Sequence, residues 1–545
     1  MLSRFVAAWF ILAAGAPAAV IRVPGDQPTI QAGIDAAAKD DTVLVRSGTY
    51  SGSGNKNLDF AGIDRVLRSE TGAEATVIDC EGVGRGLFFH NGESSATTVT
   101  GFTIRNGSVD PHGGGIYCFA ASPTITQCTI TGNSADSTGG GIYCFESSSA
   151  ITQCIVADNF SGFFGSGVYG FGSSLTITEC SITGNSSDGS GGGIYCKASA
   201  PGLAISECTI AGNSSKHGGG IFFHSNPSPA PLLTNSTIAD NSTQFDGGGV
   251  VCHKSSPTLT QCTIQGNEAG TGGGLYFNSG SHPQVVNCSI SGNVSRTNGG
   301  GIACMFSSEP NIMNCTITGN IAAIQGGGLA NLRHKSPKLT NCILWGDSPN
   351  EVYNNPDYSP ISDLTHCDVQ GGHDGEGNID ADPLWVDPSK NDFHLTSASP
   401  AIDAGTNEGA PTVDFDGDAR PQGAATDIGV DEYLEPTSCD LQVGLVDYPS
   451  TIGRGETLGF TATAANACDE ARSFDTAVMQ IRGPASLDKP LYSGAEFSLA
   501  SGAEVGAPVS LAVPTGAPTG SYSITVVLSL AGTMIDSDAF ELEVH

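Results

Sequence analysis

The chain has 545 residues and carries 55 acidic against 22 basic side chains, so its formal net charge is −33. Because proteins bind nucleic acid through clustered Lys and Arg, this charge argues against a nucleic-acid partner. Residues 101–345 are nearly neutral, with 11 acidic and 8 basic side chains, whereas residues 346–436 hold 20 acidic and 2 basic ones. That acidic segment fits either divalent-cation binding or an ordinary solvated surface.

Residues 1–18 have the features of a secretory signal peptide. Arg4 supplies positive charge, residues 5–15 form an apolar core, and residues 16–18 (APA) form a small-residue cleavage site. The apolar core is too short to cross a bilayer, and no later stretch reaches 18 continuous apolar residues. We therefore expect bacterial-type export, a secreted or cell-surface location, and no transmembrane span.

Residues 20–50 are expected to cap a repetitive fold. Within them, residues 29–38 show helical periodicity, since Ile30, Ile34 and Ala37 fall on one face. A helix at this point covers the open end of a solenoid, whose first repeat otherwise exposes its core and its strand edges.

A repeat of about 26 to 28 residues then runs from about residue 113 to residue 347. Each copy contains a Gly-rich break, an aliphatic strand and a bend that ends mostly in Gly-Asn or Asp-Asn. The bends end at Asn133, Asn159, Asn185, Asn213, Asn241, Asn267, Asn293, Asn320 and Asp347. Three short Thr- and Ile-rich strands in each copy indicate one rung of a parallel β-helix. Stacked Asn side chains are expected to pass hydrogen bonds along the column.

Alternation along the first strand of each copy assigns its side chains to two faces. Residues two apart in a strand share a face, so the columns that begin at Ile116 and Cys118 lie on one side of the sheet. Both columns are mainly apolar, so we expect this side to point inward. Cys also recurs in a column that begins at Cys128, and the two Cys columns do not lose Cys in the same copies. We therefore predict buried free thiols that pack as small apolar side chains, rather than a disulfide framework.

The residue between the two inward positions points outward and is aromatic in most copies. These residues are Tyr117, Tyr143, Tyr169, Tyr195, Phe222 and Tyr276. An outward aromatic stripe along one sheet is a candidate platform for sugar rings. The alternative is a self-stacking ladder that shields the sheet, or a stripe covered by a loop.

The paired GGGI and C-x-I-x-G-N repeats resemble those of polymorphic outer-membrane proteins, within the right-handed parallel β-helix proteins of the pectin-lyase-like superfamily. The stretch TIQAGIDAAAKDDTVLVRSGTY is similar to the N-terminal cap of many such proteins, and residues 378–432 resemble a segment that often closes bacterial β-helices. The resemblance implies an all-β, right-handed parallel β-helix. We assign the cap and β-helix to residues 20–377 and an acidic closing segment to residues 378–436. The fold alone implies no particular activity.

Residues 437–545 lack the repeat and are expected to form an immunoglobulin-like β-sandwich. Short strands near 441–446, 457–464, 477–481, 509–513, 521–530 and 540–544 alternate there with Gly- and Pro-containing turns. Cys439 and Cys468 lie outside the repeat columns and are the best candidates for a disulfide.

Asp414, Asp416 and Asp418 form the second candidate site. Alternating carboxylates suit Ca²⁺, although the spacing lacks the distal Glu of an EF-hand. The same residues also suit a turn whose Asp side chains accept backbone hydrogen bonds.

Motifs of related enzymes are missing or incomplete. The repeats show no cluster of carboxylates like that of β-helix lyases, and the chain has no Gly-His-Gly like that of polygalacturonase-type hydrolases. Asp110-Pro111-His112 matches part of an alginate epimerase motif, but Gly113 stands where that family has an acidic residue.

Two functions follow from these patterns. We favour an exported, non-catalytic protein whose side wall binds polysaccharide or other cell-surface components. The alternative is a polysaccharide lyase or glycoside hydrolase that acts on an extracellular polysaccharide, with Ca²⁺ as its metal. The catalytic status, the ligand and the oligomeric state stay open.

Overall fold

The computed structural model describes residues 18–198, 202–226, 230–333, 335–358 and 361–434, together with strands between residues 441 and 544. The chain divides into two compact units, Met1–Tyr433 and Leu434–His545. Residues 1–17 of the predicted signal peptide, and both Cys439 and Cys468 of the predicted disulfide, lie outside the described residues.

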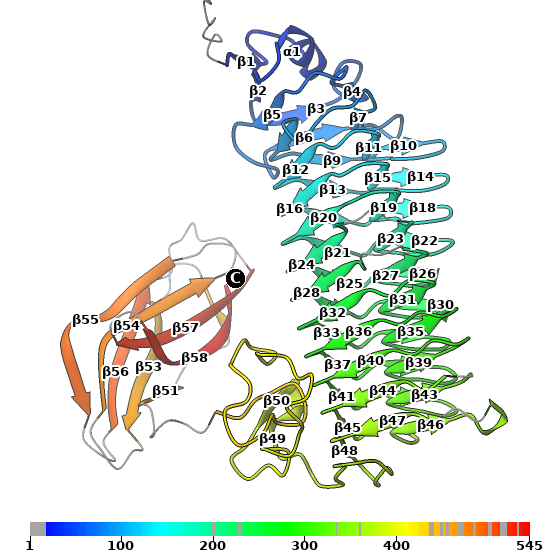
Figure 1. The fold of residues 1–545 in the computed structure, drawn as a ribbon. Coiled ribbons are helices and arrows are strands. Elements are labelled where there is room, and N and C mark those ends of the chain that lie inside the picture. The colour runs from blue at the N-terminus through cyan, green and yellow to red at the C-terminus, as the bar shows by residue number, and fades with distance from the viewer. Residues whose placement is uncertain are drawn as a thin grey trace, which may run out of the picture. The chain divides into compact units, whose positions relative to one another are not determined.

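The first unit begins with β1 (Val20–Val23) and the predicted helix, α1 (Ile30–Ala36). The Thr29 hydroxyl caps this helix by accepting a hydrogen bond from the backbone N–H of Ala32. Helix residues Ile30 and Ile34 are buried in the same core as the rungs, so the predicted helix is confirmed and packs against the solenoid core. Figure 1 shows α1 at the N-terminal end of the stacked rungs. Within the described part of the chain, no helix has the length and apolarity that crossing a membrane requires.

Four parallel sheets form the walls of the β-helix (Figure 1). One rung consists of β11 (Ile116–Phe119), β12 (Thr124–Thr126), β13 (Thr129–Thr131) and β14 (Ser134–Ala135). Their copies stack into sheets C, A, B and D, which contain 12, 14, 13 and 9 strands. Three strands per rung were predicted, so the fourth is a correction. β14 has two residues and a small inward side chain, and it lacks the β-branched run that marks a strand.

The register places alike residues above one another. In sheet C, Ile116 pairs with Ile142 and Tyr117 pairs with Tyr143. The inward Ile, Leu, Val, Phe and Cys columns form one continuous core. All 15 described cysteines are free and buried, which confirms that the Cys columns are core packing. Burial raises the pKa of the Cys252 thiol well above its usual range.

The predicted Asn ladder holds the closing bend of each rung. At Asn241, Oδ1 accepts hydrogen bonds from both the backbone N–H and Nδ2 of Asn213. Asn241 Nδ2 in turn donates to Oδ1 of Asn267. The ladder continues to Asn320, whose Nδ2 donates to Oδ1 of Asp347. Each rung is therefore tied to the next by side chains as well as by the sheets.

The acidic closing segment packs along the outer corner between sheets A and B, beside the last rungs. It contains β49 (Trp385–Asp387) and β50 (Asp392–Leu395), which Figure 1 shows alongside β45 (Ile343–Trp345). One column of rung side chains holds it through hydrogen bonds to backbone carbonyls: Gln261 to Phe415, Asn287 to Val413, Asn314 to Asp427 and Asn341 to Thr406. In earlier rungs the same column bonds to itself, as Gln127 does to Gln153. The rungs thus supply the docking groups of the closing segment.

The second unit contains two sheets whose strands pair almost entirely in antiparallel fashion. One sheet holds β51 (Leu441–Val446), β53 (Thr457–Asn466) and β56 (Glu504–Ala512). The other holds β52 (Thr451–Ile452), β58 (Thr533–Val544), β57 (Gly520–Leu530), β54 (Arg472–Arg482) and β55 (Leu487–Leu499). β55 was not predicted, because its Pro490 and Gly494 are residues that usually interrupt a strand. The unit is all-β, and its immunoglobulin-like topology stays a prediction.

Candidate functional site

The predicted Tyr stripe is a stacked ladder on the outer wall of sheet C. Its rings come from β11 and from β15 (Ile142–Phe145), β19 (Val168–Phe171), β23 (Ile194–Lys197) and β27 (Ile221–His224). Ring centroids are separated by 5.0 Å for Tyr117–Tyr143, 5.3 Å for Tyr143–Tyr169, 5.7 Å for Tyr169–Tyr195 and 5.3 Å for Tyr195–Phe222. The rings from Tyr117 to Tyr195 are therefore stacked on one another, and the Phe222 ring is tilted against Tyr195.

Loop side chains cover part of this ladder. His112 stacks on Tyr143 and Phe164 stacks on Tyr195, each with centroids 4.8 Å apart. Tyr143 and Tyr195 are consequently 6% and 3% exposed. Burial raises the pKa of Tyr169 to about 12. At these residues the geometry matches the alternative in which a self-stacking, loop-covered ladder shields the sheet.

The remaining members of the stripe differ in exposure. Tyr117, Tyr169 and Phe222 are partly exposed. Tyr276 is buried and packs with Val251 and other apolar side chains of the later rungs. The Tyr column therefore does not form an open platform of ring faces.

A second outward column runs beside the ladder. It consists of Phe119, Phe145, Phe171, Lys197, His224 and His253 on consecutive rungs. The three Phe rings stack with centroids 5.2 and 5.1 Å apart, and the Lys197 Nζ lies 5.8 Å from the Phe171 centroid. Phe119 is 40% exposed. This column was not predicted from the sequence. Strand alternation places Phe119, two residues after Tyr117, on the same outward face, so the same alternation could have identified it.

The basic end of the column lies against the end of the Tyr ladder. Tyr195 Oη and His224 Nδ1 are 2.6 Å apart. Burial, with further effects from His253, Lys197 and Lys254, lowers the pKa of His224 to about 4. His224 is therefore neutral at pH 7. Lys197 supplies positive charge beside the stacked Phe rings, and Lys254 supplies it near His224.

Asp414, one of the three predicted calcium ligands, closes a turn. Its Oδ1 accepts hydrogen bonds from the backbone N–H groups of Asp416, Gly417 and Asp418, and its Oδ2 accepts one from Glu432. This carboxylate is fully buried and directed at the backbone, as in the turn alternative. Calcium binding by Asp414, Asp416 and Asp418 stays a prediction.

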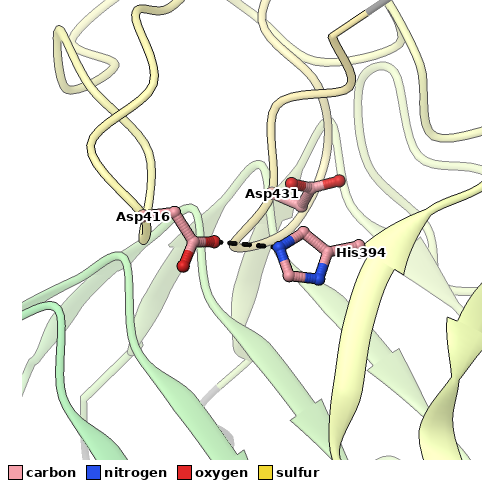
Figure 2. A group of neighbouring side chains, drawn as sticks. All are labelled: His394, Asp416 and Asp431. Atoms are coloured by element: carbon pink, nitrogen blue, oxygen red, sulfur yellow. Dashed lines mark hydrogen bonds and ion pairs between the residues drawn. The ribbon is translucent and has the colours of Figure 1, made fainter. Parts of the chain in front are cut away.

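Asp416 lies instead beside His394 of β50 and Asp431 (Figure 2). His394 Nε2 is 3.1 Å from Asp416 Oδ2, and His394 Nδ1 is 2.6 Å from Asp392 Oδ1. One ligand atom each from His394, Asp416 and Asp431 lie within 4.8 Å of one another. The Asp416 carboxylate, with a smaller effect from Asp392, raises the pKa of His394 to about 10. Burial raises the pKa of Asp431 to about 6.

A cavity of about 90 Å³ adjoins this cluster, between the closing segment and sheet B. Sheet B contributes Thr263 of β33 (Thr263–Gln265) and Ser289 of β37 (Ser289–Ser291). The closing segment contributes Asn391, Phe393, His394, Phe415, Asp416, Val430 and Asp431. The two sides are far apart in the sequence, so no local motif marks this cavity.

A family model described as "Right handed beta helix region" matches residues 66–213, 114–290 and 205–355, which together span more than half of the chain. The chain belongs to this right-handed β-helix family. Among the described residues of this β-helix protein, one group of at least three metal-capable side chains occurs, and it lies in the closing segment rather than on the rungs.

Further comparisons assign no activity to this β-helix protein. No curated protein matches it. Solved structures with local likeness include the sporulation control protein Spo0M of Bacillus subtilis, with 15% identity, 19% of this chain and 49% of that chain covered, and a TM-score of 0.16. A β-glucosidase of Listeria innocua in complex with glucose has 18% identity, coverage of 19% and 16%, and a TM-score of 0.15. The CARDB domain of the PF1109 protein of Pyrococcus furiosus, in complex with di-metal ions, has 15% identity, coverage of 21% and 99%, and a TM-score of 0.16. The match thus covers about half of the Spo0M chain and a small part of the β-glucosidase chain. Because all three TM-scores are low, these likenesses assign no function to this protein.

Proposed function

We propose that this β-helix protein is exported and binds glycan chains through the outer wall of sheet C, without catalysing a reaction. The observation that carries the proposal is the outward column in which Phe119, Phe145 and Phe171 precede Lys197 on consecutive rungs. It places a partly exposed aromatic strip directly before a cation.

The column suits an extended ligand that lies along the stack of rungs. Because strands repeat about every 4.8 Å along a sheet, a chain of sugars meets a similar side chain at each rung. The exposed part of the Phe column offers apolar contact area to sugar C–H groups. Lys197 and Lys254 offer charge-assisted hydrogen bonds to carboxylate or sulfate groups. Repulsion from the distant acidic segment is screened beyond about 8 Å at physiological salt.

Retention on immobilised polysaccharides tests the proposal. The variant Phe119→Ala/Phe145→Ala is expected to elute early, because it removes the apolar contact area that two consecutive rungs offer to the ligand. Phe160→Ala/Phe245→Ala is the matched control, because these residues are 41% and 46% exposed on sheet D. If the wild type binds no polysaccharide in a panel of neutral and acidic chains, or if both variants lose retention equally, the proposal is wrong.

The same panel tests the catalytic alternative. A lyase produces unsaturated ends and a hydrolase produces new reducing ends, so both are measured with and without Ca²⁺. Robust turnover in any sample replaces our proposal with a polysaccharide lyase or glycoside hydrolase.

Two further parts of the proposal rest on sequence patterns alone. Export predicts that protein recovered from the medium begins at Ala19, which N-terminal sequencing checks. For residues 437–545 we propose an immunoglobulin-like β-sandwich, and an experimental structure of this unit with another topology contradicts that assignment.

A further inference from the structure

Independently of the glycan-binding wall, we propose that the cavity between the closing segment and sheet B binds one divalent transition-metal ion, of which Zn²⁺ is the best fit. His394 Nε2 and one carboxylate oxygen each of Asp416 and Asp431 are the ligands. Ser289 Oγ forms a hydrogen bond with a water molecule that occupies the remaining coordination position of the ion.

The three ligand atoms already converge. With bonds of about 2.0–2.2 Å, two ligands of a tetrahedral Zn²⁺ site lie about 3.3 Å apart. His394 Nε2 and Asp416 Oδ2 are 3.1 Å apart, and the group as a whole fits within 4.8 Å (Figure 2). A cation between them therefore requires small side-chain adjustments rather than a change of fold. On binding, it replaces the proton on Nε2, as metals do at histidine ligands.

A second layer of hydrogen bonds orients these ligands. A metal-bound His usually donates its other ring N–H to a carboxylate, and His394 Nδ1 lies 2.6 Å from Asp392 Oδ1. This contact directs Nε2 toward Asp416. Asp431 Oδ2 accepts a hydrogen bond from the backbone N–H of Leu395, which holds that carboxylate beside the ring.

Ser289 supplies an independent indication of a ligand. It is 6% exposed, it lines the cavity, and its Oγ is buried without a hydrogen-bond partner. Leaving a buried hydroxyl unpaired costs about 1–3 kcal/mol, so a native fold normally provides a partner. The cavity of about 90 Å³ has room for an ion with bound water, since a water molecule occupies about 30 Å³.

The ligand chemistry selects the ion. An imidazole nitrogen favours Zn²⁺ and other transition metals over Ca²⁺ and Mg²⁺, which prefer oxygen ligands only. Three protein ligands leave the fourth tetrahedral position for water. The ion would connect β50 with the segments that carry Asp416 and Asp431, and so stabilise the closing segment, while its bound water would link that segment to Ser289 of sheet B.

Titration calorimetry with ZnCl₂ on the metal-stripped, full-length mature protein tests this site. We expect one saturable site per chain in the wild type and none in His394→Ala or Asp416→Asn. Asp418→Asn is the matched control, because it removes one charge from the same turn without removing a ligand. Ser289→Ala should weaken binding by about 10- to 100-fold, as losses of outer hydrogen bonds at metal sites do. Far-UV circular dichroism verifies the fold, and Asp416→Asn carries the test if His394→Ala misfolds, since Asp416 is exposed.

Co²⁺ provides a second readout, because its absorption spectrum distinguishes imidazole and carboxylate ligands from thiolates. A spectrum without thiolate bands, lost in Asp416→Asn and kept in Asp418→Asn, supports the site. The proposal is overturned by a wild type that binds no Zn²⁺, by Asp416→Asn that binds like the wild type, by thiolate bands, or by Ca²⁺ that competes equally with Zn²⁺. None of these outcomes depends on whether sheet C binds glycan.

Discussion

Replacing Asn267 by Ala is a direct test of the Asn ladder as a source of stability. Asn267 is fully buried, and its Oδ1 accepts hydrogen bonds from the backbone N–H and the Nδ2 of Asn241. Its Nδ2 donates to the Ile238 carbonyl and to Asn293 Oδ1. The variant removes all four of these contacts at once.

The cost follows from the groups that stay buried without a partner. Asn241 loses the acceptor for its backbone N–H and for one of its two amide hydrogens, because Nδ2 keeps only its bond to the Ile210 carbonyl. Each unpaired buried donor costs about 1–3 kcal/mol, so two such donors give about 2–6 kcal/mol. In a solenoid each repeat contacts its neighbours, so this loss should be concentrated in the rungs beside residue 267.

Hydrogen exchange measured by mass spectrometry resolves individual rungs. At about 1.4 kcal/mol per factor of ten, amides in the rungs that contain Asn241 and Asn293 should exchange at least about 30-fold faster in Asn267→Ala. The rung that contains Ile116 should change little. Asn91→Ala is the control, since Asn91 is exposed and lies outside the ladder. Unchanged exchange beside residue 267 would falsify the view that the side-chain ladder stabilises the rungs.

Two further predictions concern buried charge. Arg420 and Glu432 form an ion pair of 3.0 Å whose side chains are 0% and 1% exposed, so Arg420→Ala should cost about 3–5 kcal/mol and expose the closing segment to limited proteolysis. Wild-type cleavage kinetics would contradict this expectation. Burial and the neighbouring Glu351 carboxylate raise the pKa of Asp347 well above its usual range, so the folded state holds a proton that the unfolded state releases. Stability should therefore fall as pH rises above about 4, and Asp347→Asn should gain in Tm over the wild type between pH 4 and pH 7. A Tm difference that is equal at both pH values would exclude this linkage.

The sequence by itself determined the features that repeat or that depend on neighbouring residues. A period of 26 to 28 residues predicted the rungs, and residue parity predicted the inward Ile116 and Cys118 columns and the outward Tyr117 column. The apolar face of Ile30, Ile34 and Ala37 predicted the cap helix. These features can be predicted because the copies stack in register. Equivalent residues of different copies then lie above one another in the same environment, so the environment inferred for one copy applies to the others.

Only the tertiary structure decided what covers the walls and which distant segments meet. Parity placed Tyr195 outside the rung, but Phe164 from a loop covers it, so the same side chain is outward and buried. The cavity at Ser289 and His394 forms because the closing segment folds back onto sheet B. No period links these residues, and their proximity depends on packing between segments far apart in the chain. The repeat thus predicted how the rungs stack, whereas the candidate metal site arises where the non-repetitive segment packs against them.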